Sequence, residues 1–198
     1  GTITGGGLPE PSIADITASV AADPETAMLM DPAFLYDFVY NKVPKFADYV
    51  YQGDQGWSGG SAPYIGYYNP SLPKADPSQD PKVTVVNGDL SLSGNMTGGG
   101  LLVVTGDFIA SGTLTFNGLV LVIGSGNVVL SGLNQGIHGG LFVANLTLQG
   151  GIPTFGTPTF SVSGNSDILI DADALLMGSG LIPASQRGFR EVTSSLDP

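Results

Sequence analysis

The sequence predicts a mainly β protein that folds as a parallel β-helix, with a small N-terminal helical segment packed on one side. Glycine recurs every six residues from Gly88 to Gly124. Between these glycines the even positions are apolar or glycine and the odd positions are mostly Asn, Asp, Ser or Thr, which is the alternation of half-buried strands. The phrase VVxGDxxxSG occurs at residues 85–94 and again, eighteen residues later, at 103–112. We interpret this phrase as a repeated building unit.

The composition agrees with this architecture. The 198 residues fit one domain, and 42% of them are hydrophobic, which argues against disorder. Charged residues make up only 12% of the chain, whereas 30 residues are glycine, as in β structures with tight turns. The net charge of −11 without a basic run excludes direct binding to nucleic acid. The sequence contains no run of about eighteen apolar residues, so no membrane span is predicted. The lack of cysteine excludes disulfides and thiolate metal sites.

Three glycine bends in eighteen residues would close one coil, and stacked coils would place Val85 beneath Val103 and Leu121. A later coil is longer, with twenty-two residues before LFVAN resumes the pattern at Leu141. Because this number is even, we expect side chains to keep their inward or outward direction. Strand-like runs continue at 159–164 and 167–173. We assign residues 81–198 to a β-helix with a C-terminal tail and coils of about 18–22 residues, right-handed because parallel β connections overwhelmingly are. The left-handed hexapeptide form remains an alternative.

Two outward-facing columns of this β-helix are apolar and would leave a large hydrophobic strip exposed. We expect residues 1–80 to cover that strip. Within them, helices are predicted at 13–20, at 24–30 and from Asp31, where Asp-Pro pairs provide an N-cap and a proline at the first helical position. Two more helical turns are predicted after Pro44, and a loop over 53–81. The columns contain Val83, Leu101, Leu119 and Leu141, and Val85, Val103, Leu121 and Val143.

All seven tyrosines and the single tryptophan lie between Tyr36 and Tyr68. One interpretation is a packed seam between the helices and the β-helix, with the hydroxyl groups reaching water. The other is an exposed aromatic platform that contacts partners or surface glycans. The stretch WSGGSAPYIGYYNP is rich in glycine and proline and is the best candidate for such contacts. Its candidate residues are Trp57, Tyr64, Tyr67 and Tyr68.

Four aspartates are candidates for a calcium site. Asp89 and Asp107 should stack at adjacent corners, where like charges need compensation by backbone N–H groups or by a cation. The turn interpretation is favoured and calcium is the alternative. Asp171 and Asp173 form the other acidic cluster, without an EF-hand pattern. His138, the only histidine, lies in a predicted loop and cannot by itself form a metal site or a nucleophile–base pair. No catalytic residue and no other cofactor are therefore predicted.

Residues 98–126, GGGLLVVTGDFIASGTLTFNGLVLVIGSG, resemble a stretch of PilX-like type IV pilus assembly proteins, which carry a GLLVV-GD-T-SG-FTFNGLVLV-G pattern. DPKVTVVNGDLSLSGN at 80–95 and GFREV at 188–192 resemble flanking segments of that family. The sequence begins without the family's hydrophobic pilin helix, through which alone membrane contact would be expected. It also has no cysteine near 168–176, where many members carry one. The resemblance implies a structural role in pilus biogenesis, with pilin or pilus-assembly subunits as partners and an extracellular, cell-surface or periplasmic location.

We therefore expect a non-catalytic structural or interaction domain of a minor-pilin-like protein. The alternative is a carbohydrate-binding or polysaccharide-cleaving β-helix. In the tail, Arg187, Phe189 and Arg190 are expected to dock onto the acidic body of the protein, or else to contact a pilin partner.

Overall fold

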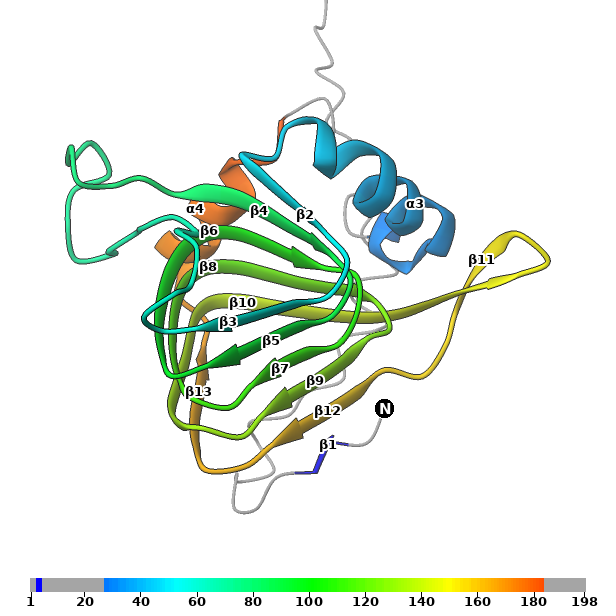
Figure 1. Ribbon diagram of the computed structural model, residues 1–198. Coiled ribbons are helices and arrows are strands. Elements are labelled where there is room, and N and C mark those ends of the chain that lie inside the picture. The colour runs from blue at the N-terminus through cyan, green and yellow to red at the C-terminus, as the bar shows by residue number, and fades with distance from the viewer. Residues whose placement is uncertain (1–2, 5–26, 184–198) are drawn as a thin grey trace, which may run out of the picture.

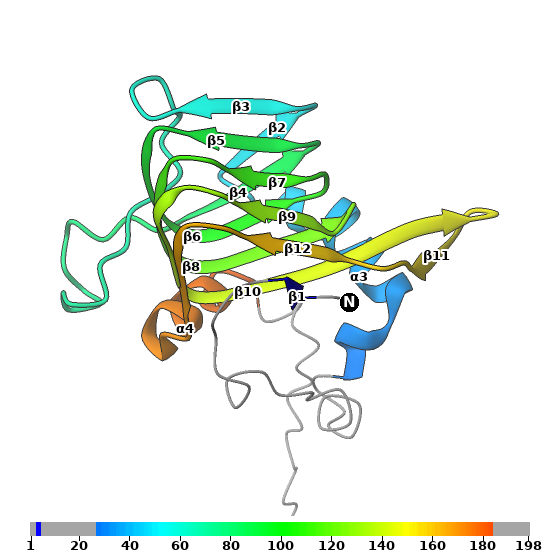
Figure 2. The same cartoon turned by 90° about the horizontal axis from the view of Figure 1, so that it is seen from below.

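The computed structural model describes residues 3–4 and 27–183, and its strands form two sheets (Figures 1 and 2). The first sheet contains, in order, β3 (Gln55–Ser58), β5 (Leu90–Ser93), β7 (Phe108–Ala110), β9 (Asn127–Leu130), β12 (Thr159–Val162) and β1 (Ile3–Thr4). The second contains β2 (Tyr49–Gln52), β4 (Lys82–Asn87), β6 (Asn95–Val104), β8 (Thr113–Gly124), β10 (Leu133–Gln149) and β11 (Ile152–Phe155), and β13 (Asn165–Leu169) also pairs with β10. Every pairing is parallel except that of β10 with β11. The protein is therefore mainly β with parallel strands, as predicted.

From β2 to β10 the chain alternates between the two sheets, so each strand from β2 to β8 pairs with the strand two elements further on. In the second sheet Val85 pairs with Val103 and Val103 with Leu121. In the first sheet Leu90 pairs with Phe108. These partners are eighteen residues apart, which confirms the predicted stacking for β4 to β8.

The predicted register of the longer repeat was wrong. Val120 pairs with Leu141, 21 residues later, and not with a residue 22 positions away. Relative to the eighteen-residue repeat, two extra residues lie before β9, where Phe108 pairs with Val128, and one more lies before Ile137. An odd offset reverses the direction of every side chain. Leu141 and Val143, which were expected to face outward, therefore pack against the interior between the sheets.

The main core lies between the two sheets and consists of the inward side chains of alternating positions. The largest fully buried members include Phe108 and Phe116. Its buried residues are Trp57, Ile65, Val86, Leu90, Leu92, Met96, Leu102, Val104, Phe108, Ala110, Leu114, Phe116, Val120, Val122, Val128, Leu130 and Ile137.

A second core lies on the outer face of the second sheet, beneath the N-terminal helices, and confirms the predicted cover (Figure 1). Val83, Val103 and Leu121 on the sheet are buried beneath the helices. Phe142 takes the outward position that was expected of Val143. The helical residues that complete this core are Leu35, Phe38, Val39 and Val43.

The cover begins with a 3₁₀ turn, η2 (Met28–Met30), and the helix α3 (Pro32–Asp37). The Asp31 carboxylate accepts the N–H of Ala33 at 2.9 Å, and proline occupies the first helical turn, so the predicted Asp-Pro start is confirmed. The helix continues as a π-helical turn, η3 (Phe38–Lys42), and a 3₁₀ turn, η4 (Val43–Lys45), at Pro44.

Three other expectations about elements were wrong. The helical turns predicted after Pro44 give way to β2, and the predicted loop over 53–81 contains β3. Both sheets therefore begin before residue 80, within the segment assigned to the cover. The run at 167–173 leaves the sheet after Leu169 and starts α4 (Ala172–Gly180).

Helix α4 packs against the outer face of the second sheet through its small residues. Ala174 and Gly178, one helical turn apart, are its buried residues. A Cβ at Gly178 would lie 2.6 Å from the backbone nitrogen of Leu119, so only glycine permits this approach. The predicted helix at 13–20 and the tail residues Arg187, Phe189 and Arg190 lie outside the described residues.

Candidate functional site

A chain of hydrogen bonds links side chains at one corner of successive strands. The N–H of Asp89 donates to Oδ1 of Asp54 at 3.0 Å, and the N–H of Asp107 donates to Oδ1 of Asp89 at 2.8 Å. Nδ2 of Asn127 then donates to Oδ2 of Asp107 at 2.9 Å, and Thr159 Oγ1 donates to Oδ1 of Asn127 at 2.5 Å. We call this series the corner ladder. Each carboxylate accepts a hydrogen bond from a donor at the next corner of the ladder, and not the predicted bond from its own turn.

The structure does not bring the four calcium candidates together. Asp89 and Asp107 belong to the corner ladder. Asp171 caps α4 by accepting the N–H of Ala174 at 2.9 Å, and Asp173 forms an exposed ion pair with Lys74 at 3.2 Å. Within residues 3–4 and 27–183, no group of three or more His, Cys, Asp or Glu side chains could hold a metal ion.

The proposed aromatic platform separates into buried and exposed residues. Trp57 and Tyr68 are 6% and 3% exposed, so their assignment as surface contacts was wrong. The Trp57 ring packs edge-on against Tyr51, with 5.2 Å between centroids, and closes one end of the main core. Tyr64 and Tyr67 are 50% and 40% exposed and remain available at the surface.

Tyr64 is held at the surface by Asp80, whose Oδ2 accepts its hydroxyl at 2.9 Å. Lys82 pairs with the other oxygen of the same carboxylate. Hydrogen bonds from Lys82 and Tyr64 lower the pKa of Asp80. Partial desolvation, followed by the bond to Asp80, raises the pKa of Tyr64. The trio fixes the end of the loop that precedes β4.

A groove with several polar side chains, which we call the polar groove, lies on the outer face of the second sheet, beside the loop of residues 67–71. Its volume is about 350 Å³. Thr97 of β6, Thr115 of β8 and His138 of β10 form its floor, and Tyr67 belongs to its wall. The remaining lining residues are Tyr68, Asn69, Pro70, Ser71, Gly98 and Asn117.

His138 lies on a strand of this groove, so its placement in a loop was wrong. It pairs with Asn117 of β8, and its Nδ1 lies 3.1 Å from Oδ1 of that asparagine. The groove could not be predicted from the sequence, because its residues are separated by up to 71 positions. The one hint of the groove in the sequence is that threonine occurs at both 97 and 115, one repeat apart, at positions whose side chains face outward.

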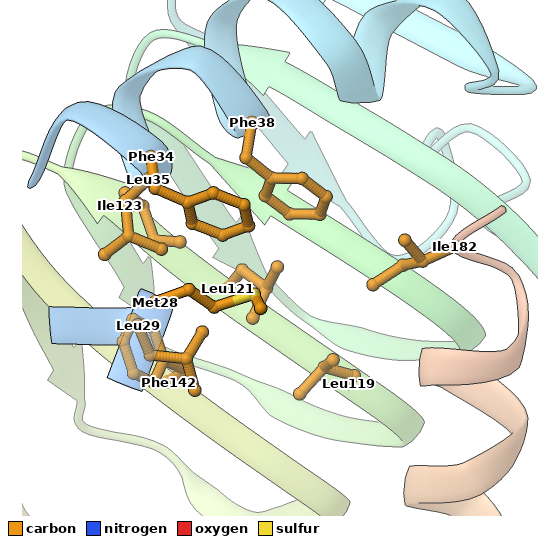
Figure 3. A pocket seen from close by; sticks show the side chains of 10 residues that line it. All are labelled: Met28, Leu29, Phe34, Leu35, Phe38, Leu119, Leu121, Ile123, Phe142 and Ile182. Carbon is orange, nitrogen blue, oxygen red and sulfur yellow. The ribbon is translucent and has the colours of Figure 1, made fainter. Parts of the chain in front are cut away.

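A second, apolar pocket of about 260 Å³ lies between the cover and the outer face of the sheet (Figure 3). Phe34 and Phe38 extend into it from the cover, and Leu121 and Phe142 approach from the sheet. Ile182, after α4, lies at the opposite side. The lining continues the second core, so this pocket is the incompletely filled part of that core.

An antiparallel hairpin projects from the body of the protein (Figures 1 and 2). It comprises residues 146–155, where the end of β10 pairs with β11 around Gly150 and Gly151, and we call it the hairpin arm. One face is apolar throughout, because Leu146 pairs with Phe155 and Leu148 with Pro153. The other face carries Thr147, Gln149, Ile152 and Thr154.

The hairpin arm exposes unusually large apolar side chains. Leu148 is 54% exposed, Ile152 67% and Phe155 41%. No charged residue occurs between 145 and 158. Isolated two-stranded hairpins are only marginally stable in water, and exposed apolar patches commonly mark interaction sites. The arm is therefore a candidate contact element.

In the described part of the chain, no helix combines the length and apolar character that crossing a membrane requires. Comparison with known proteins adds no assignment: no family model, curated protein or solved structure matches this chain significantly.

Proposed function

We infer that the two sheets are faces of one right-handed parallel β-helix. The alternation of the chain between sheets and the eighteen-residue register of β4 to β8 support this inference. The ten residues of β6 and the twelve of β8 each span two of the six-residue faces predicted from the glycines. Gly100, at the boundary between two faces in β6, pairs with Gly118 of β8.

Removal of one repeat tests the β-helix. Deletion of residues 89–106 joins Gly88 to Asp107 and preserves the VVNGD phrase, so stacking should persist with one coil fewer. A deletion of residues 89–97 removes half a coil and should abolish folding. Far-ultraviolet circular dichroism and thermal unfolding would compare the two variants. Complete loss of structure in both would contradict the inference.

We propose that this β-helix is a non-catalytic structural and interaction domain of a surface assembly, similar to PilX-like type IV pilus assembly proteins. The observation that carries the proposal is the hairpin arm, where Leu148, Ile152 and Phe155 are exposed and no residue is charged. The base of the arm contacts the body through Leu146, which packs against the second core, and through β11, which lies beside α3. The resemblance of residues 80–126 to the pilus proteins adds the kind of partner, a pilin or another assembly subunit. The acidic candidates for polysaccharide chemistry are engaged in the corner ladder and in a helix cap.

Complementation of a gene deletion in the source bacterium tests the proposal. The wild-type gene should restore surface pili, counted by electron microscopy, and the double variant Leu148→Ser/Phe155→Ser should not. Both side chains are exposed, so the double variant should unfold at nearly the wild-type temperature. The matched control is Gln149→Ser, on the opposite face of the same hairpin, which should restore pili.

Two results would count against different parts of this proposal. Normal piliation in the gene deletion would contradict the role in pilus assembly. Loss of pili in the deletion but full restoration by the arm variant would contradict the hairpin arm as the contact element.

A further inference from the structure

The polar groove is held in a preformed shape by contacts between its wall and its floor. Asn117 Nδ2 donates a hydrogen bond to the backbone oxygen of Tyr68 at 2.7 Å, which ties the loop to β8. A Cβ at Gly99 would lie 2.3 Å from the backbone nitrogen of Tyr68, so the loop packs directly on the strand. Further along the loop, Asn69 is fixed by two hydrogen bonds with Gln79, at 2.9 and 2.8 Å. A ligand would therefore meet an ordered site.

The hydrogen-bond network defines the tautomer of His138. Because Nδ2 of Asn117 donates to Tyr68, Oδ1 of Asn117 is the acceptor that faces His138. Nδ1 of the neutral imidazole must then carry the hydrogen, and Nε2 is left as an acceptor. Gly136 makes room for this ring, since a Cβ there would lie 3.1 Å from Nε2.

Two hydroxyl groups stand beside this acceptor. Thr97 and Thr115 are paired neighbours on β6 and β8, and Thr115 pairs with Gly136 on β10. Neither threonine side chain forms a hydrogen bond with another described residue. The floor thus offers two groups that can donate or accept and one imidazole nitrogen that accepts.

The chemistry of the lining selects the ligand. None of the residues that line the groove is charged, and the chain as a whole has a net charge of −11, so an anionic ligand gains no partner and is repelled. The exposed ring of Tyr67 provides an apolar wall beside the polar floor. A sugar ring matches this combination, because it presents C–H groups on one face and hydroxyl groups at its edge. The volume of about 350 Å³ lies within the range of small-ligand sites.

We propose that this groove binds a neutral hexose unit of a saccharide. The Tyr67 ring packs against the C–H face of the sugar, and the sugar hydroxyls bond with Thr97, Thr115 and Nε2 of His138. The site lies on a different part of the surface from the hairpin arm and does not depend on the proposed role in pilus assembly.

Isothermal titration of the full chain with maltotriose, cellotriose, chitotriose, mannotriose and lactose tests the proposal, with trigalacturonate as the anionic comparison. At least one neutral sugar should bind, and trigalacturonate should bind more weakly than that sugar. Thr115→Val keeps the side-chain shape but removes the hydroxyl, and it should weaken binding about fivefold to tenfold. Tyr67→Ala should weaken it at least as much.

The matched control is Tyr64→Phe, at an exposed tyrosine outside the groove, which should leave the affinity unchanged. Thermal unfolding of each variant would show that the fold is intact. Three results would overturn the proposal: no binding of any neutral sugar at millimolar concentration, preferential binding of trigalacturonate, or an affinity unaffected by Thr115→Val and Tyr67→Ala. These results do not depend on piliation, so they leave the proposed assembly role to be judged separately.

Discussion

Replacement of Gly118 by alanine should destabilise the protein strongly, because Gly118 lies in a column of glycines where neighbouring strands change direction. It pairs with Gly100 on one side and with Gly139 on the other, and its φ is +148°. A Cβ at this position would lie 2.0 Å from the backbone oxygen of Gly100. The neighbouring backbone belongs to a paired strand and can retreat only by lengthening the hydrogen bonds between β6 and β8.

Two terms determine the size of the effect. The left-handed backbone conformation costs an L-residue about 1–3 kcal/mol, and forcing a methyl group into a packed contact costs about 1–3 kcal/mol more. The reduced entropy of the unfolded chain returns about 0.4–1 kcal/mol. We therefore expect a loss of about 3 kcal/mol, which lowers the Tm of a chain of this size by roughly 6–12 °C.

Thermal and urea unfolding followed by circular dichroism would measure this loss. The matched control is Gly60→Ala, because a Cβ at Gly60 would have no atom within 4 Å. That variant should unfold within about 2 °C of the wild type. If Gly118→Ala proved as stable as Gly60→Ala, the close approach of backbones along the glycine column would be refuted.

Four further predictions follow from buried or hydrogen-bonded side chains. Val103→Asp places an unpaired charge in the fully buried second core and should lower the free energy of unfolding, measured in urea, by about 3–5 kcal/mol; wild-type stability would mean that the core is open to water. The fluorescence of Trp57, the only tryptophan, should resist quenching by acrylamide. Strong quenching in the folded protein would show that Trp57 is exposed at the surface. Asp107→Ala should cost about 1 kcal/mol by removing an acceptor from the corner ladder, and Asp107→Asn should recover part of that loss; equal losses would show that the side-chain oxygen is not needed. Hydrogen bonds from Lys82 and a tyrosine lower the pKa of Asp80, so the stabilisation from its carboxylate is complete above the ordinary carboxyl pKa and is lost as the pH falls through the lowered value. The urea midpoints of the wild type and of Asp80→Asn should therefore differ at neutral pH and converge in acid. A difference that stays constant with pH would contradict this linkage.

The alternation of side chains between residues 83 and 124 is long enough to predict strands, stacking and the apolar outer columns. Shorter segments do not carry that information. Three residues separate Tyr49–Gln52 from the preceding helical turn, and four residues fit either periodicity, so only the pairing of β2 with β4 decides its conformation. Helix α4 has three consecutive large residues, Leu175 to Met177, and contacts the sheet through Ala174 and Gly178, so its sequence shows no apolar stripe.

The register of β10 could not be obtained by counting. The sequence shows where the apolar pattern resumes, but three residues are added at two separate turns, and Leu141 and Phe142 fit an inward or an outward position equally well. Their directions follow from pairing with Val120 and Leu121. The candidate site was missed for a related reason. Loop 67–71 meets Thr97, Thr115 and His138 only after three strands have been aligned side by side.

The pairing of β1 with β12 has a consequence for the order in which the chain folds. Ile3 lies beside Phe160, so the first described strand joins the sheet through the last strand of that sheet to be synthesised. The intervening strands β4 to β9 contact neighbours one repeat away and can assemble as they leave the ribosome or a secretion channel. Strand β1 must wait for β12, because Ile3 and its partner Phe160 are 157 residues apart. The slow, long-range step of folding is therefore the docking of β1 onto β12, and a variant without Ile3 and Thr4 should fold faster with little loss of stability in the body.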